Sequence, residues 1–196
     1  MTEYTSRTIY FSRPGRANTE RTLEIARTRA DELGLQTVLV ATTSGETGVR
    51  AVRHFQNLDL IVVTHSTGFK APDVQELTPE NSSVIEAAGV RILTGQHAFG
   101  GVNRAVRKKL ATYQLDEIIA HTLRIFGEGI KVVAEMALMA ADAGLVRTDT
   151  PVIAIAGTGR GADTAAILQP TNAQSFFDLK ILEIICRPSP AHPALS

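Results

Sequence analysis

Short apolar runs alternate with amphipathic, helix-like stretches along most of the chain. Thr37–Ala41 and Leu60–Thr64 are apolar runs without polar alternation, which is typical of strands covered on both faces. Between them, Val49, Val52 and Phe55 recur at helical spacing and predict a helix with one buried face. A strand, a helix and a second strand in this order predict parallel pairing through a right-handed crossover.

The same alternation continues on both sides of this unit. Before it, a helix is predicted between Asn18 as its cap and Gly34 as its end, with Leu23, Ala26, Ala30 and Leu33 on one face. After it, a short helix is predicted over Pro79–Ala88. Further strands are predicted at Thr8–Phe11, Val90–Thr94, Val152–Ala156, Ala165–Pro170 and Lys180–Cys186.

Residues 100–145 show an almost continuous helical pattern. One apolar stripe consists of Leu115, Ile118, Ile119, Leu123 and Phe126, and a second of Ile130, Val133, Ala137, Leu138 and Ala141. Gly127 and Gly129 are predicted to mark the bend between them. The order of elements predicts the α/β class: a three-layer α/β/α sandwich with an open, mostly parallel sheet, in a single domain over residues 1–196.

The composition is that of an ordinary globular protein, with 44% hydrophobic and 20% charged residues. Twenty basic residues balance twenty acidic ones, so we expect neither nucleic acid nor a membrane surface as partner, and Arg104–Lys109 as a solvated helix face. Cys186 is the only cysteine, which excludes an internal disulfide and fits a reducing compartment. Without an apolar signal core or a run of membrane-spanning length, a cytoplasmic location is expected.

Four loops follow the predicted parallel strands, and all four are rich in glycine and hydrogen-bonding side chains. They are T-T-S-G-E-T (42–47), H-S-T-G-F-K (65–70), G-Q-H-A-F-G-G-V-N-R (95–104) and G-T-G-R-G-A-D (157–163). In open α/β sheets, ligands bind outside the carboxyl ends of the strands, where the winding direction reverses. The sequence therefore predicts a ligand crevice at this edge, although loops of such sheets are polar even without a ligand.

The first loop has the features of an anion site. Its hydroxyl groups come from Thr42, Thr43, Ser44 and Thr47. Gly45 permits close backbone approach, and the start of the following helix presents unpaired N–H groups. The alternative is that Ser44 simply caps this helix, with Glu46 in its first turn and no ligand bound.

The last loop combines flexible backbone with a permanent charge. Gly157, Thr158, Gly159 and Gly161 allow a ligand close to the main chain, and Arg160 is suited to phosphate or carboxylate. Asp163 either accepts hydrogen bonds from ligand hydroxyls or caps its own turn. The spacing G-x-G-x-G, followed by a strand, is not a dinucleotide-binding fingerprint.

Side chains of the two middle loops offer acid–base groups and aromatic rings. His65 and His97 are candidate catalytic residues if both reach the crevice near Glu46 or Asp163, but ordinary loop hydrogen bonding is the more common role of such histidines. Their spacing fits no local metal motif, and no metal is expected. Further candidates are Gly68, the anion contacts Lys70 and Arg104, and Phe69 and Phe99, which either stack on a planar ligand or belong to the core.

The run V-L-V-A-T-T-S-G-E-T-G-V-R-A-V-R-H-F, followed by L-D-L-I-V-V-T-H, resembles the C-terminal domain of pyruvate kinase. In regulated pyruvate kinases the equivalent loop binds a phosphate of a sugar-bisphosphate effector. The resemblance implies phosphate contacts at Thr42, Ser44, Gly45 and Thr47, and a second effector loop at 157–163. Glu46 would repel a second negative group nearby, so a sugar bisphosphate is not expected.

The resemblance also bounds the activity. Pyruvate kinase chemistry belongs to a barrel domain for which 196 residues leave no room, so we expect no pyruvate kinase activity. The chain is similar to small, free-standing archaeal and bacterial proteins of this domain type, which implies a phosphorylated ligand such as flavin mononucleotide (FMN). Three functions stay open: a phosphate-ligand binding protein, an enzyme using a histidine, and a homo-oligomeric interaction module that associates through residues 115–145.

Overall fold

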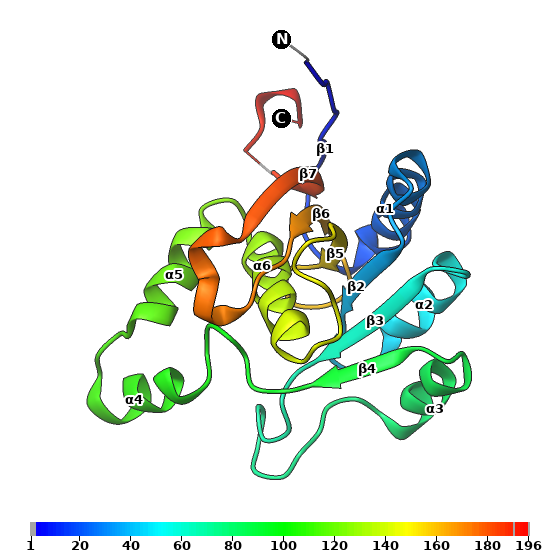
Figure 1. Ribbon diagram of the computed structural model, residues 1–196. Helices are drawn as coiled ribbons and strands as arrows, with labels where there is room; N and C mark the ends of the chain where they lie inside the picture. Colours follow the sequence, from blue (N-terminus) through cyan, green and yellow to red (C-terminus); the bar gives the residue numbers. More distant parts are fainter. Residues whose placement is uncertain (1–2, 190, 196) are drawn as a thin grey trace.

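A computed structural model describes residues 3–189 and 191–195, and its helices lie on both faces of a central sheet (Figure 1). The sheet of the described chain has the strand order β1-β7-β6-β5-β2-β3-β4. These strands are β1 (Ile9–Phe11), β2 (Thr37–Ala41), β3 (Asp59–Thr64), β4 (Arg91–Thr94), β5 (Val152–Ala156), β6 (Thr164–Gln169) and β7 (Lys180–Pro188). All pairs are parallel except the two made by β6, so the predicted mostly parallel sheet is confirmed.

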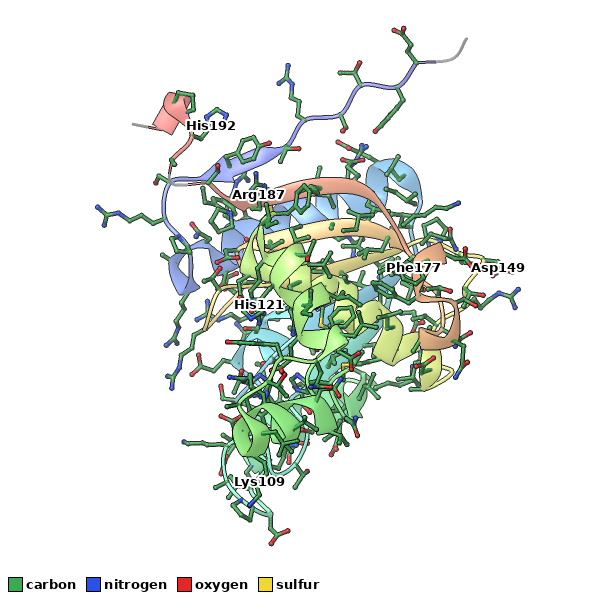
Figure 2. All side chains as sticks on the ribbon, turned by 90° about the vertical axis from the view of Figure 1, so that its left-hand side faces the viewer. Lys109, His121, Asp149, Phe177, Arg187 and His192 are labelled. Atoms are coloured by element: carbon green, nitrogen blue, oxygen red, sulfur yellow. The ribbon has the colours of Figure 1, made fainter. Side chains whose placement is uncertain are left out.

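The helices form the two outer layers. They are α1 (Thr19–Leu33), α2 (Glu46–His54), α3 (Pro79–Ala87), α4 (Val102–Leu110), α5 (Leu115–Arg124) and α6 (Glu128–Asp142), with short 3₁₀ turns at Arg16–Asn18, Ala173–Asp178 and Pro193–Leu195. α1, α2 and α3 lie on one side of the sheet and α6 on the other, with α5 packed on α6 (Figure 1). α4 and α5 belong to the face turned toward the viewer in Figure 2. The predicted three-layer α/β/α arrangement is therefore confirmed.

The winding direction reverses between β2 and β5. The chain adds β3 and β4 on one side of β2, crosses back through α6, and places β5 on the other side of β2. The register pairs Val40 with Val62 of β3 and with Ile155 of β5. This switch point brings the loops that begin at residues 42 and 157 to the same edge of the sheet.

The central strands are buried on both faces, which explains their unbroken apolar sequence. In β2, Val38 and Val40 join the core beneath α1 and α2, while Leu39 joins the core beneath α6. The same alternation continues in β5, where Ile153 and Ile155 face α1 and Ala154 faces α6. Such strands need no polar face because helices cover both sides.

Several local predictions need correction. Asn18 precedes α1, but its side chain donates to the Arg13 carbonyl instead of capping the helix. Leu33 is largely exposed rather than on the buried face of α1. In α2, the buried positions are Thr47, Gly48 and Ala51, whereas Val49 and Val52 are only partly buried. α2 packs most closely at Gly48, where a Cβ atom would lie 2.9 Å from the Ile85 side chain of α3 and 3.2 Å from that of Val62 in β3.

The long helical stretch divides into three helices. Gly127, with φ 122°, breaks the chain between α5 and α6 as predicted. Gly129 lies inside α6, where a Cβ atom would collide with Thr164 of β6. Most of α6 is buried, but α5 leaves Leu115 and Ile118 of the predicted stripe exposed.

Two further observations concern location and redox chemistry. Among the described residues, none of the helices combines the length and apolar character needed to cross a membrane. Cys186 is buried in β7 beside Ile9, and this burial raises the pKa of its thiol to about 12.

Candidate functional site

A cavity of about 580 Å³ opens at the carboxyl ends of β2, β3 and β5, between these strand ends and α6. Its polar lining includes Thr42, Thr43, Ser44, Thr47, His65, Lys70, His97 and Arg160. Val63, Val132, Met136 and Met139 supply apolar surface in the same cavity. The switch point of the sheet is therefore a hollow that mixes hydroxyl groups, charges and an apolar wall.

The 42–47 loop is held in shape without using most of its hydroxyl groups. Thr42 Oγ1 accepts a hydrogen bond of 3.0 Å from the Gly45 N–H. Gly45, with φ 100°, occupies the N-cap position of α2, so the predicted Ser44 cap is wrong. The Ser44 carbonyl accepts from Asn81 Nδ2 at 2.9 Å, which ties the loop to α3.

This arrangement leaves several donors directed to the cavity region. Within the described chain, the hydroxyls of Thr43, Ser44 and Thr47 have no hydrogen-bond partner, and no side chain caps α2. Gly45 packs tightly, because a Cβ atom there would collide with Asn81. The loop therefore presents free hydroxyls at a helix N-terminus, the arrangement that suits an anion.

The 157–163 loop faces this loop across the cavity, but only part of it lines the hollow. Gly157, Gly159, Arg160 and Gly161 are in the lining, whereas Thr158 and Asp163 are not. Arg160 makes no ion pair with any described residue, and it is the cation that this loop offers to a ligand.

Asp163 has a structural environment. It is fully buried, and its carboxylate accepts from Gly15 N at 2.8 Å, Thr158 N at 3.0 Å and Thr164 Oγ1 at 2.8 Å. The bonds from Thr158 and Thr164 are local, as the turn-capping alternative predicts. The bond from Gly15 also connects the 157–163 loop to the loop after β1. Asp163 does not line the cavity, so its environment favours the turn-capping alternative over a contact with ligand hydroxyls.

The structure brings His65 and His97 close together, but the carboxylates beside them are not the two predicted from the sequence. Their ring centroids are 5.3 Å apart. His65 Nδ1 lies 2.8 Å from Glu76 Oε2, and His97 Nδ1 lies 3.6 Å from Glu135 Oε2. Neither Glu46 nor Asp163 takes this place, since both belong to the opposite side of the crevice near the loop after β1.

The two predicted aromatic contacts have different outcomes. Phe69 lies in the cavity lining, with its ring centroid 4.2 Å from His65 and 4.9 Å from His97, and the Arg104 guanidinium lies 4.5 Å from its centre. Phe99 is buried in the core that α5 and α6 share, so it does not stack on a ligand in this cavity. Gly68 lies outside the main cavity and lines a smaller neighbouring one.

A buried ion pair on α6 completes the site and was missed by sequence reasoning. Lys131 and Glu135 form an i,i+4 pair, and their side chains are only 7% and 4% exposed. Glu135 also accepts from the Phe99 N–H at 2.9 Å. Burial acts to raise the pKa of Glu135, but its contacts with His97 and Lys131 outweigh burial and lower the pKa to about 2. Glu135 is therefore ionised at neutral pH.

The segment after β1 was also missed. Arg16 Nη2 lies 2.8 Å from Glu46 Oε2, and Gly15 bonds Asp163, so this segment lies beside the cavity mouth. The sequence signal for this segment is the turn S-R-P-G-R-A-N after a predicted strand. The sequence did not predict that this strand pairs with β7 at the edge of the sheet.

A family model for the pyruvate kinase alpha/beta domain matches residues 20–168. The chain belongs to this family. Two structures of pyruvate kinase from Cryptosporidium parvum are also similar. One is 14% identical, with 76% of this chain and 23% of that chain covered and a TM-score of 0.39. The other, in complex with ADP, is 14% identical, with 84% and 23% covered and a TM-score of 0.38. This chain thus spans less than a quarter of either pyruvate kinase.

The region matched to the pyruvate kinase alpha/beta domain contains both loops of the switch point, 42–47 and 157–163, as well as the two histidines and the Lys131–Glu135 pair. Arg16 and all of β7 lie outside it. The contact between Arg16 and Glu46 therefore joins a residue outside the matched region to the loop expected to hold a phosphate.

Proposed function

We propose that this member of the pyruvate kinase alpha/beta domain family binds a phosphate-bearing small molecule at the carboxyl edge of its sheet. The phosphate would lie on residues 42–47, and the rest of the ligand would extend along the cavity toward His65, Phe69 and His97. One observation carries the proposal: the unpartnered hydroxyls at the start of α2 and the unpaired Arg160 line the same cavity at the switch point.

The cavity also has room and surface for the remainder of such a ligand. A volume of about 580 Å³ lies within the range of small-molecule sites. Val132, Met136 and Met139 provide an apolar wall against which a ring would pack, and Lys131 and Glu135 provide polar groups beside it. FMN, which the family resemblance suggests, is the first compound to test, and other phosphate esters follow.

The first experiment identifies what the unmodified protein carries. The protein is purified, denatured, and its released small molecules are analysed by mass spectrometry and by visible absorption. A flavin or another phosphorylated compound at near-equal amount supports the proposal. If none is released, a series of phosphate esters is tested by thermal shift, because a ligand that binds only the folded state raises the melting temperature.

A substitution then tests the place of the phosphate. Ser44→Asp puts a negative charge among the free hydroxyls and should raise the Kd by about tenfold or more through like-charge repulsion. Ser83→Asp is the matched control, since Ser83 is exposed on α3 and lines neither cavity. Equal affinity for the Ser44 variant and the control would remove the loop from the proposal.

A second function, catalysis on the bound phosphate compound, is favoured by the paired imidazoles. A carboxylate lies near Nδ1 of each ring, and the Nε2 atom of neither ring has a hydrogen-bond partner among the described residues. His65→Asn and His97→Asn should then keep binding of the identified compound and lose its turnover. Neither the binding function nor this catalytic function includes pyruvate kinase activity, so an assay with phosphoenolpyruvate and ADP should yield no pyruvate.

A further inference from the structure

A second cavity, of about 550 Å³, lies next to the first at the ends of β3 and β4. Its walls are the 66–69 loop, the 94–97 loop and the start of α4. Phe69, His97 and Arg104 line both cavities and form the wall between them. The second cavity therefore adjoins the candidate site and shares this wall with it.

The charges around this cavity have one sign. Arg104 and Lys108 line it, and no aspartate or glutamate does, whereas four glutamates line the first cavity. Neither cation has an ion-pair partner in the part of the chain that the structure describes. Arg104 has only the face of Phe69, 4.5 Å away. Two unpaired cations around a carboxylate-free hollow give it a positive potential.

The polar groups of the cavity are donors suited to an oxyanion. Ser66 and Thr67 supply hydroxyls, and Gln96 supplies an amide. α4 begins here at Val102, with Gly101 as its N-cap residue, and within the described chain it has no side-chain cap and no acidic residue in its first turn. His97 Nε2, in the shared wall, is a buried polar atom with no hydrogen-bond partner among the described residues.

Glycines keep this surface open. A Cβ atom at Gly100 would lie 2.9 Å from Arg104 Nη2, and one at Gly101 would collide with Gln96. Larger residues would therefore displace the arginine and the amide from the cavity wall. The close approach of these side chains to the backbone places their donors beside the N–H groups at the start of α4.

We propose that this second cavity is an additional phosphate-binding site, with Arg104 and Lys108 as its cations and the 94–101 backbone as its floor. The site takes the phosphate group of a small molecule, either a second group of the ligand in the first cavity or one carried by a separate compound. The inference goes beyond the proposed function and does not depend on it, because Lys108, Gly100 and Gly101 line only the second cavity, whereas Arg160 and the 42–47 loop line only the first.

Titration of the ¹⁵N-labelled chain with inorganic phosphate, at constant ionic strength kept with sodium chloride, tests the site. The amides of Gly95, Gly100 and Gly101 should shift in ¹H–¹⁵N spectra with one Kd. Those of Gly45 and Gly157 report on the first cavity with their own Kd. Absence of a phosphate-specific shift at Gly95, Gly100 and Gly101 would overturn the inference.

Charge reversals separate the two sites. Lys108→Glu should weaken phosphate binding at the second cavity by about fivefold or more and leave the first unchanged. The control is Lys109→Glu, the same charge change one residue along α4, at the edge of the molecule and outside both linings (Figure 2). If both variants weaken binding equally, a general charge effect replaces the site and the inference fails.

Ser44→Asp completes the design. It should weaken only the shifts at Gly45 and Gly157. If those shifts are absent in the unmodified protein while the Lys108-sensitive shifts are present, the proposed function fails and the second site stands. The reverse pattern leaves the proposed function in place and overturns the second site.

Discussion

The imidazole rings of His65 and His97 lie with their centroids 5.3 Å apart and their planes tilted by 53°. They come from the ends of neighbouring parallel strands, whose last residues, Thr64 and Thr94, are in register and share a hydrogen bond of 2.7 Å. Each ring has a carboxylate at Nδ1, from Glu76 for the first and Glu135 for the second. The pair is thus built from four segments of the chain, and its arrangement depends on the buried charge of Glu135.

That buried charge gives a prediction for stability against pH. The pKa of Glu135 is lowered to about 2 in the folded protein, from an ordinary value of 4.5. The ionised carboxylate therefore contributes its full stabilisation above pH 4.5, and this is lost as the pH falls toward 2. Glu135→Gln should cost about 3 kcal/mol of unfolding free energy at pH 7, and the difference from wild type should shrink through this window.

Urea denaturation of both proteins at a series of pH values measures this difference. Lys131 is the partner left unpaired in the variant, so Lys131→Met combined with Glu135→Leu should recover much of the loss, because neither side chain of the pair is then charged. A difference between wild type and Glu135→Gln that stays constant from pH 7 to pH 2.5 would contradict the pKa assignment.

Asp163 should act on stability rather than on ligand affinity. Its buried carboxylate accepts from Gly15, Thr158 and Thr164, and it joins the loop after β1 to the loop after β5. Asp163→Asn replaces an acceptor with an amide that cannot satisfy all three donors, and it should cost about 3 kcal/mol in urea denaturation. The exposed Asp178→Asn should be close to neutral. A stable Asp163 variant that no longer binds ligand would instead support the ligand-hydroxyl interpretation.

Much of the fold could be predicted because local patterns and topology agree. The unbroken apolar runs of β2 and β3 identify strands buried on both faces, and the glycines at 34 and 127 end helices as their φ values require. The order of strands and helices then determines which loops share an edge. For this reason the 42–47 and 157–163 loops could be placed together from sequence alone.

The side chains that complete the site could not be predicted, because their partners lie far apart in sequence. Glu76 meets His65 only because the 66–76 segment folds back. The Lys131–Glu135 pair sits in a helix that is buried nearly all round, where its charges resemble an ordinary exposed i,i+4 pair. The apolar stripe predicted on α5 is only partly buried. Ile119 and Leu123 pack toward α6, whereas Leu115 and Ile118 face outward.

Arg16 should control the affinity of the first cavity for phosphate. Glu46 lines that cavity, and Arg16 neutralises it across 2.8 Å. Arg16→Ala leaves the carboxylate unpaired and should weaken phosphate binding about two- to fivefold, while the double variant Arg16→Ala, Glu46→Gln should restore it. Phosphate titrations at low salt measure the effect, which should fade as ionic strength rises. Unchanged affinity in both variants would exclude this electrostatic role.

The exposed apolar face of α5 predicts self-association, the third function left open by the sequence. Leu115, Ile118 and Ile125 are 68%, 54% and 80% exposed and recur along one side of the helix. A second copy that covers this face would remove their apolar surface from water, which is the main favourable term in association. Ile125→Lys places a charge in such a contact and should weaken the dimer by about tenfold or more.

Sedimentation equilibrium over a range of protein concentrations measures the dimer constant of each variant. Val84→Lys is the matched control, because Val84 is a similarly exposed apolar residue on α3, a helix on the other side of the sheet. A wild-type protein that stays monomeric at all concentrations, or equal weakening by both substitutions, would contradict association through α5. If Ile125→Lys yields a folded monomer that still binds phosphate, ligand binding and self-association are separate properties of the same domain.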